Sequence, residues 1–182
     1  AMLQSESAEN IAHYIQVGHD AMRNIEASLT AAGRSFDDIG RCLDMACGSG
    51  RVLRQLQTKI PPARITACDI DEEAVRFLAA EFGVEPIVSS KNLRTVSFPH
   101  RYDLIWVGSL FSHLEPTMAF DLYDQLIGLL EPKGVLVFTT QGAECIKRLK
   151  DYGFVFVELE DAMRESLAVK GHAFAPYFAN QD

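Results

Sequence analysis

Short strand-like segments alternate with longer helix-like segments along residues 41–140, and this alternation constrains the fold more than any other feature of the chain. Strands are predicted at 41–45, 65–68, 86–88, 102–107 and 135–140, and helices at 51–59, 71–82 and 116–130. Parallel strands need a crossover connection, which is usually a helix that packs on the sheet. We therefore expect a three-layer α/β sandwich, with a mostly parallel sheet between helices on both faces.

The two ends of the chain add to this core. A helix is predicted over residues 5–32, ended by Gly33, because its apolar residues recur at helical spacing: Ile11, Tyr14, Ile15, Met22, Ile25 and Leu29. Residues 141–182 are read as a helix at 142–150 and strand-like stretches at 154–159 and 173–178. Either these stretches pair, or the chain is truncated before the last strand of the sheet; we favour the second.

The whole chain, residues 1–182, is interpreted as one domain, since no repeat or linker interrupts it. With incomplete C-terminal strands the edge of the sheet would be open, and an open edge favours self-association.

Composition argues against several kinds of partner. The formal net charge of −8 opposes binding to a phosphate backbone, so nucleic acid is not an expected partner. No apolar run reaches the roughly 20 residues that a membrane span requires. The cysteines form no C-x-x-C pair and are interpreted as reduced, which favours a cytoplasmic protein: Cys42, Cys47, Cys68 and Cys145. No cluster of residues has metal-ligand spacing, so no metal site is predicted.

A glycine-rich turn separates the first strand from the next helix. Gly48 and Gly50 permit a tight turn and a close approach of a ligand to the backbone. The N–H groups of the following helix favour an anionic group there. A dinucleotide site would need a small residue three positions after the second glycine, where this chain has Leu53. A pyrophosphate-binding NAD site is therefore disfavoured.

An acidic residue follows the second strand. Asp69 lies about 20 residues after the turn, where a carboxylate accepts hydrogen bonds from the ribose hydroxyls of an adenosine cofactor. The alternative role, capping the next helix, suits Asp71 better, because Glu72 and Glu73 follow it.

The segments Asp44-Met-Ala-Cys-Gly-Ser-Gly50 and Cys68-Asp-Ile-Asp71 together resemble those of the class I S-adenosylmethionine-dependent methyltransferases, over roughly residues 40–140. The chain departs from that pattern at Ala46, where many members have glycine. The resemblance implies a Rossmann-like fold and S-adenosylmethionine as the cofactor. It also implies that Asp44 orients the turn and approaches the cofactor's amino group, and that five turn residues cradle its methionine end: Ala46, Cys47, Gly48, Ser49 and Gly50.

The same resemblance extends to the adenosine end. Asp69 would hold the ribose and Ile70 would pack on the adenine. Family members often have an acid after the third strand, whereas this chain has Ser89-Ser-Lys-Asn92. Ser90, or alternatively Asn92, is the expected substitute, with much of the adenine recognition left to the backbone.

The loop after the fourth strand, Val107-Gly-Ser-Leu-Phe-Ser-His113, would face the reacting centre in such an enzyme. Ser109 and Leu110 are expected to line the cofactor. His113 is the candidate general base for a hydroxyl acceptor, although a structural role is favoured as long as no geometry supports catalysis. The loop lacks an Asn/Asp-Pro-Pro-Tyr/Phe motif, which argues against methylation of base or amide nitrogen.

The sequence thus predicts an S-adenosylmethionine-dependent methyltransferase that acts on a small-molecule acceptor. Two alternatives remain open: a non-catalytic cofactor-binding module on the same fold, and, with less support, an NAD-dependent oxidoreductase.

Overall fold

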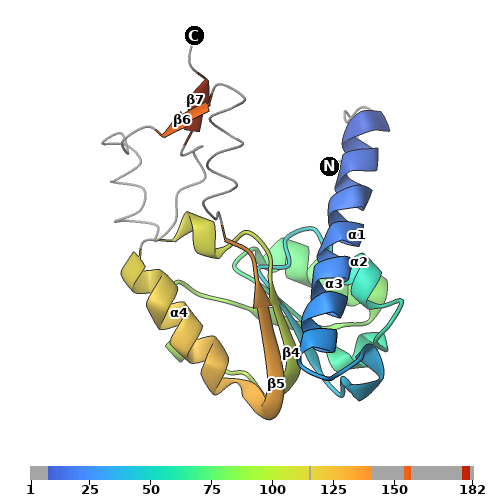
Figure 1. Ribbon diagram of the computed structural model, residues 1–182. Helices are drawn as coiled ribbons and strands as arrows, with labels where there is room; N and C mark the ends of the chain where they lie inside the picture. Colours follow the sequence, from blue (N-terminus) through green and yellow to red (C-terminus); the bar gives the residue numbers. More distant parts are fainter. Residues whose placement is uncertain (1–7, 115, 141–153, 157–177, 181–182) are drawn as a thin grey trace.

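The computed structural model describes residues 8–114, 116–140, 154–156 and 178–180, and its centre is a five-stranded parallel sheet (Figure 1). The strand order is β3-β2-β1-β4-β5. The strands are β1 (Cys42–Met45), β2 (Ile65–Asp69), β3 (Glu85–Val88), β4 (Tyr102–Val107) and β5 (Leu130–Phe138). The order reverses direction between β1 and β4, and ligands of open α/β sheets bind beyond the carboxyl ends of the strands at such a switch point.

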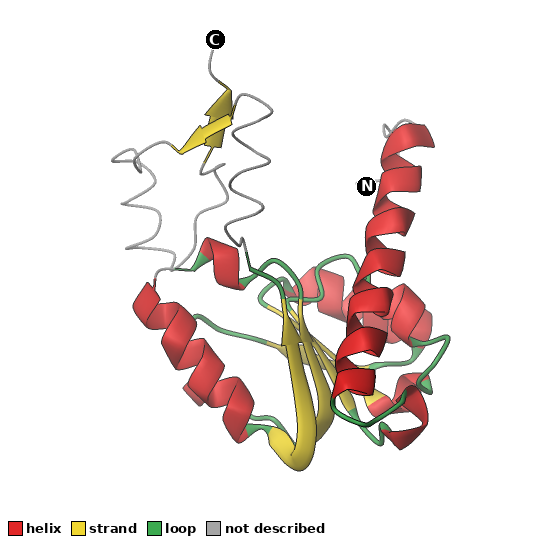
Figure 2. Ribbon diagram, in the orientation of Figure 1, coloured by secondary structure: helices red, strands yellow, loops and turns green. Residues whose placement is uncertain are grey.

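Helices cover both faces of this sheet, so the predicted three-layer α/β sandwich is confirmed (Figures 1 and 2). One face carries α1 (Ala8–Ala31), α2 (Leu53–Leu56) and α3 (Glu72–Phe82), and the other carries α4 (Pro116–Gly128). Each face has its own apolar core. Side chains from β1, β2 and β4 enter both cores, because successive residues of a strand point to opposite faces.

Helix α1 is buried on one side from Gly18 onward. Ala21, Ile25 and Leu29 are buried against the sheet, whereas Ile11 and Ile15 are 44% and 46% exposed. The helix ends as predicted at Gly33, whose φ of +68° is the left-handed conformation of a helix C-cap. The first half of α1 rises past the carboxyl ends of the strands (Figure 1).

Two predicted boundaries are wrong. The helix expected over 51–59 is reduced to the four residues of α2, flanked by turns. The turn expected at Pro132–Gly134 lies inside β5, which begins at Leu130 instead of residue 135. There the pairing with β4 shifts register between Tyr102 and Leu104, and a Cβ atom on Gly134 would lie 2.7 Å from the carbonyl oxygen of Tyr102. The Pro-Lys-Gly sequence thus forms an irregularity within the strand rather than its start.

The C-terminal part contains a short antiparallel pair, β6 (Phe154–Phe156) and β7 (Phe178–Asn180), outside the five-stranded sheet. This pair meets in part the alternative that we disfavoured, with its second strand at 178–180 rather than 173–178. Within the described residues β5 is the outermost strand of the main sheet. The helix predicted at 142–150 lies outside the described residues. Among the helices that the structure describes, none is long and apolar enough to cross a membrane.

Candidate functional site

The turn after β1 is held in a conformation that few side chains tolerate. Ala46, Gly48 and Gly50 have φ angles of +58°, +50° and +80°, all in the left-handed region. A Cβ atom on Gly50 would lie 2.5 Å from Cδ2 of Leu78, so α3 packs directly on the turn. Glycine at position 50 is therefore favoured by its φ, and any larger residue would also force the Leu78 side chain to shift. Ala46 adopts this conformation despite its methyl group.

Asp44 is the buried acid of the site. It lies on β1 with 2% of its surface exposed, and its Oδ2 atom has no hydrogen-bond partner among the described residues. Burial, and to a smaller extent the charge of Asp69, raise the pKa of its carboxyl group to about 7, although the backbone N–H of Leu53 acts in the opposite direction. An unpaired buried carboxyl group is costly, so this one is suited to receive a cationic or hydrogen-bonding group of a ligand.

Asp69, at the end of β2, ties the glycine-rich turn to the second strand. The backbone N–H of Gly48 donates to its Oδ2 over 2.8 Å, and the N–H of Asp71 donates to its Oδ1 over 3.0 Å. Each carboxylate oxygen accepts two hydrogen bonds, so both oxygens retain capacity for the hydroxyls of a ribose. The next residue, Ile70, is an apolar side chain left 50% exposed beside them.

The capping role proposed for Asp71 is confirmed. Its side chain accepts hydrogen bonds from the N–H groups of Glu73 and Ala74 at the start of α3. The two acids of the Cys68-Asp-Ile-Asp71 segment thus have separate tasks.

The loop after β4 is fixed to the end of β5. Ser109 has a φ of +61°, and its N–H donates to Oγ1 of Thr139 over 2.7 Å. Leu110 is partly buried in the α4-side core. His113 is half-buried at the end of a 3-10 turn, where its backbone N–H donates to the carbonyl of Leu110. The role of His113 as a general base stays a prediction.

The polar residues after β3 are engaged in their own turn. Oγ of Ser90 donates to the carbonyl of Asn92 over 2.8 Å and lies 2.9 Å from Oγ1 of Thr95. Oδ1 of Asn92 accepts from the N–H of Arg94. A hydroxyl that already donates to a carbonyl has only its acceptor sites left, and an adenine amino group is a donor that fits them.

Sequence reasoning missed a contact that α1 makes with the turn. The hydroxyl of Tyr14 donates to the carbonyl oxygen of Ser49 over 3.4 Å and lies 3.2 Å from its Oγ. The guanidinium of Arg51 stacks on the Tyr14 ring, with Cζ 4.8 Å from the ring centroid. The spacing of Ile11, Tyr14 and Ile15 predicted which face of the helix is apolar. It did not predict which residues of the turn that face would contact.

The described cysteines are structural. Cys42, Cys47 and Cys68 are buried and not disulfide-bonded. Burial raises the pKa of the Cys68 thiol to about 12 and raises that of Cys47 even further, so both remain protonated and are poor nucleophiles. Cys47 contributes its backbone to the turn, and its backbone N–H donates to the carbonyl of Cys68. Among the described side chains, no three metal-ligating groups gather in one place.

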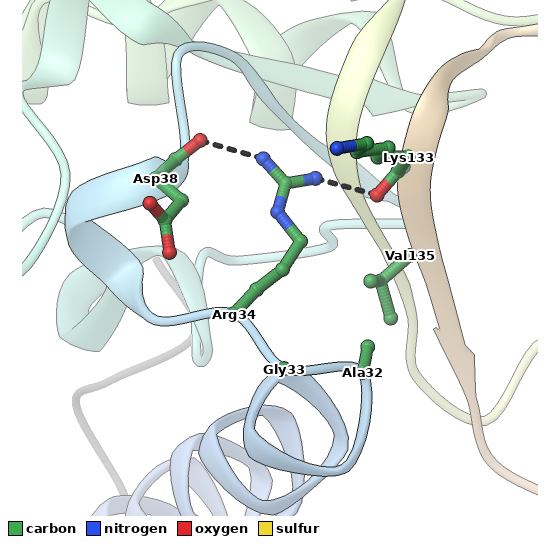
Figure 3. A pocket seen from close by; sticks show the side chains of 7 residues that line it. Ala32, Gly33, Arg34, Asp38, Lys133 and Val135 are labelled. Atoms are coloured by element: carbon green, nitrogen blue, oxygen red, sulfur yellow. Dashed lines mark hydrogen bonds between the residues drawn. The ribbon is translucent and has the colours of Figure 1, made fainter.

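A hollow of about 630 Å³ lies near the other end of the strands, beside Lys133 and Gly134 of β5 (Figure 3). Arg34 crosses it and donates to the carbonyls of Lys133 and Asp38 over 2.6 and 2.7 Å. The same guanidinium pairs with Asp103 over 3.1 Å. Its hydrogen bonds are directed to the protein itself, so this hollow is interpreted as a structural joint rather than as a ligand site.

Comparisons with known proteins identify the family and the fold of the chain. The profile of the methyltransferase domain family matches residues 42–134. The chain is 28% identical over 122 residues to a malonyl-[acyl-carrier protein] O-methyltransferase of Halalkalibacterium halodurans, which covers 63% of this chain and 44% of that protein. The chain spans about half the length of the curated relatives it matches.

Solved structures show the same fold. The N-methyltransferase NodS of Bradyrhizobium japonicum, in complex with S-adenosylhomocysteine, superposes with a TM-score of 0.54 at 18% identity, covering 77% of this chain and 76% of that one. The plantazolicin methyltransferase BpumL, also in complex with S-adenosylhomocysteine, gives a TM-score of 0.57 at 18% identity, covering 87% and 60%. At these identities the likeness concerns the fold.

Proposed function

This chain belongs to the methyltransferase domain family, and we propose that it is an S-adenosylmethionine-dependent methyltransferase acting on a small-molecule acceptor. The observation that carries the proposal is the buried Asp44, whose Oδ2 lacks a partner among the described residues. It lies beside a turn that is held open by three left-handed residues and tied to Asp69. An amino acid joined to a ribose is the kind of ligand that such a set of groups fits.

The residues divide this ligand between them. The carboxyl group of Asp44 would receive the ammonium group of the methionine part, and the backbone from Ala46 to Gly50 would lie along it. The free acceptor sites of Asp69 would hold the ribose hydroxyls, and the exposed Ile70 would cover one face of the adenine. Ser109, Leu110 and Ser90 would border the rest of the cofactor.

When bound, S-adenosylmethionine supplies a methyl group that its positively charged sulfur has already activated. The chain therefore has to position the acceptor in line with that methyl group and keep water away, rather than activate the donor. Fixing Ser109 to Thr139 serves this positioning, because it ties the loop after β4 to the end of β5.

A small acceptor is supported by two observations. The net charge of −8 opposes nucleic acid, and the curated relatives are malonyl-[acyl-carrier protein] O-methyltransferases, whose acceptor is a small acyl group on a carrier. A free small molecule and a small group on a carrier protein both fit this description.

Calorimetric titration with S-adenosylmethionine, S-adenosylhomocysteine and NAD tests the proposal. We expect binding of the two sulfur nucleotides and none of NAD. Asp69→Asn should weaken that binding by roughly tenfold or more, since a charged acceptor of hydrogen bonds is lost. The matched control is Asp71→Asn, which removes the same charge two residues away and keeps a good helix cap.

The outcomes separate the candidate functions. Binding of NAD alone would favour the oxidoreductase, and failure of the wild-type chain to bind either sulfur nucleotide would overturn the proposal. Tight binding without methyl transfer to any member of a panel of hydroxyl, carboxyl, amino and thiol acceptors would favour a non-catalytic module.

A further inference from the structure

We propose that Arg51, held by Tyr14, binds the carboxylate of the cofactor's methionine part. This inference rests on the proposed function and extends it to a residue of the site that the sequence motifs do not include. Arg51 is the first residue after the glycine-rich turn. Its guanidinium stacks on Tyr14 of α1, and the Tyr14 hydroxyl in turn contacts Ser49 of the turn.

One contact places the guanidinium, and two further contacts hold its neighbours near the turn. It lies over the Tyr14 ring, with Cζ 4.8 Å from the centroid, and the Tyr14 hydroxyl contacts both oxygens of Ser49. Helix α1 also comes close to the backbone of Arg51, because a Cβ atom on Gly18 would lie only 2.9 Å from the Arg51 carbonyl oxygen. The charge of Arg51 is thus held next to Ser49, at the methionine end of the expected ligand.

The geometry of the stack leaves the guanidinium able to bind an anion. A cation–π contact uses the flat face of the group, whereas its five N–H donors point outward in the plane. Two of these donors match the two oxygens of a carboxylate. A stack on Tyr14 therefore limits the motion of the side chain without occupying the donors that a carboxylate requires.

The charges on the two sides of the turn complement the ligand. The methionine part carries both an ammonium and a carboxylate group, and Asp44 offers a partner for the ammonium only. Arg51 is exposed and forms no ion pair within the described residues, whereas Arg34 and Arg76 do, with Asp103 and Glu72. The turn thus has an acid on its buried side and an unpaired cation on its open side.

Arg54 provides a matched control. Its guanidinium stacks on the ring of Phe82 with Cζ 4.9 Å from the centroid, so it makes the same kind of contact three residues further along. Phe82 ends α3 and does not belong to the turn. Arg51→Met and Arg54→Met therefore remove the same charge from two similar stacks, of which only one adjoins the expected methionine end.

The test compares two ligands by calorimetry: S-adenosylhomocysteine, and 5′-methylthioadenosine, which lacks the amino-acid part. We expect Arg51→Met to weaken S-adenosylhomocysteine about tenfold and to leave 5′-methylthioadenosine within about twofold. Arg54→Met should change neither affinity. Tyr14→Leu, which removes the stack, should weaken S-adenosylhomocysteine in the same selective way but less.

A purely structural role of Arg51 would lower the affinity for both ligands alike, and that result would overturn the inference. Unchanged affinity for S-adenosylhomocysteine in Arg51→Met would overturn it as well. Failure of the proposed function looks different, because the wild-type chain would then bind neither ligand, and the inference would fall with it.

Discussion

Asp44, the residue proposed to bind the cofactor's ammonium group, imposes a cost on the folded protein. The carboxyl group is buried, and its pKa is raised from 3.8 to about 7 by burial and by the neighbouring Asp69. A raised pKa means that the folded state binds more protons than the unfolded state between about pH 4 and pH 7. Stability therefore falls as the pH rises through this window and stays reduced above it.

We expect Asp44→Asn to remove that dependence. One pKa unit corresponds to about 1.4 kcal/mol, so the variant should be more stable than the wild type at pH 8 by roughly 1–3 kcal/mol, after allowing for the amide's own unmet hydrogen bonds. Urea unfolding at pH 5 and pH 8 measures the difference. A wild-type stability that does not change between these two pH values would contradict the prediction.

The same group should couple cofactor binding to protons. An ammonium group beside Asp44 favours its charged form, so binding lowers its pKa and releases a proton near pH 6–7. Affinity for S-adenosylhomocysteine should therefore rise with pH up to about 7 and then level off. Titrations in two buffers with different ionisation enthalpies will detect the proton, and Asp44→Asn should abolish its release. A wild-type chain that releases no proton would argue against contact between Asp44 and the ammonium group.

Substitutions at two left-handed residues of the turn, Ala46 and Gly50, should change the stability of the chain in opposite directions. Ala46→Gly relieves a strained φ of +58°, and it should stabilise the chain by about 0.5–1 kcal/mol after the greater chain entropy of glycine is subtracted. Gly50→Ala adds strain at φ +80° and a clash with Leu78, and it should destabilise by several kcal/mol. Thermal unfolding of both variants gives the signs, and a stabilising Gly50→Ala would contradict the geometry of the turn.

At the scale of elements, strands defined by packing were predicted better than segments defined by local turns. β4 has its predicted bounds, because five of its six residues are buried and apolar on both faces of the sheet. The helix over 51–59 failed because its apolar spacing is satisfied by the short α2 and two turns that bury Leu53, Leu56 and Ile60 equally well. The turn predicted at Pro132–Gly134 was wrong because Gly134 packs against Tyr102 inside strand β5.

The site follows the same division. The motifs located Asp44, the turn and Asp69, since these depend on neighbouring residues and on strand ends. They did not locate Tyr14 or Arg51, because the contact between them depends on the angle at which α1 crosses the turn.

Gly18 sets that crossing of α1. Alanine would favour the helix by about 1 kcal/mol, yet its Cβ atom would meet the Arg51 carbonyl oxygen at 2.9 Å, so the helix has to shift away from the turn. We expect Gly18→Ala to weaken S-adenosylhomocysteine several-fold more than 5′-methylthioadenosine, because the shift moves Tyr14 and Arg51. Gly128→Ala, at the end of α4 with open space around it, is the control. Equal affinities in both variants would show that the crossing is not tight.

In the molecule as a whole, the groups proposed to bind the cofactor and the contacts that stabilise the fold lie at opposite ends of the strands. The carboxyl ends carry the turn, Asp69 and the Ser109 loop. Near the amino ends, the Arg34–Asp103 pair joins the end of α1 to β4, and Oδ2 of Asp103 accepts from the N–H groups of Gly40 and Arg41. The hollow beside Arg34 lies at this joint, at the end of the sheet opposite the glycine-rich turn and Asp69.

Arg34→Met should therefore affect stability without affecting binding. The change removes the Arg34 donor from Oδ1 of Asp103 and from the Lys133 carbonyl, in a region where Arg34 is only 14% exposed, and a loss of about 1–3 kcal/mol in the free energy of unfolding is expected. Affinity for S-adenosylhomocysteine, measured below the unfolding transition, should stay within about twofold of the wild type, because the turn and Asp69 lie at the other end of the strands. Lys133→Met keeps the Lys133 carbonyl and should change neither quantity. A large loss of affinity in folded Arg34→Met would mean that the two ends of the sheet are coupled, and the separation of binding from support would then be wrong.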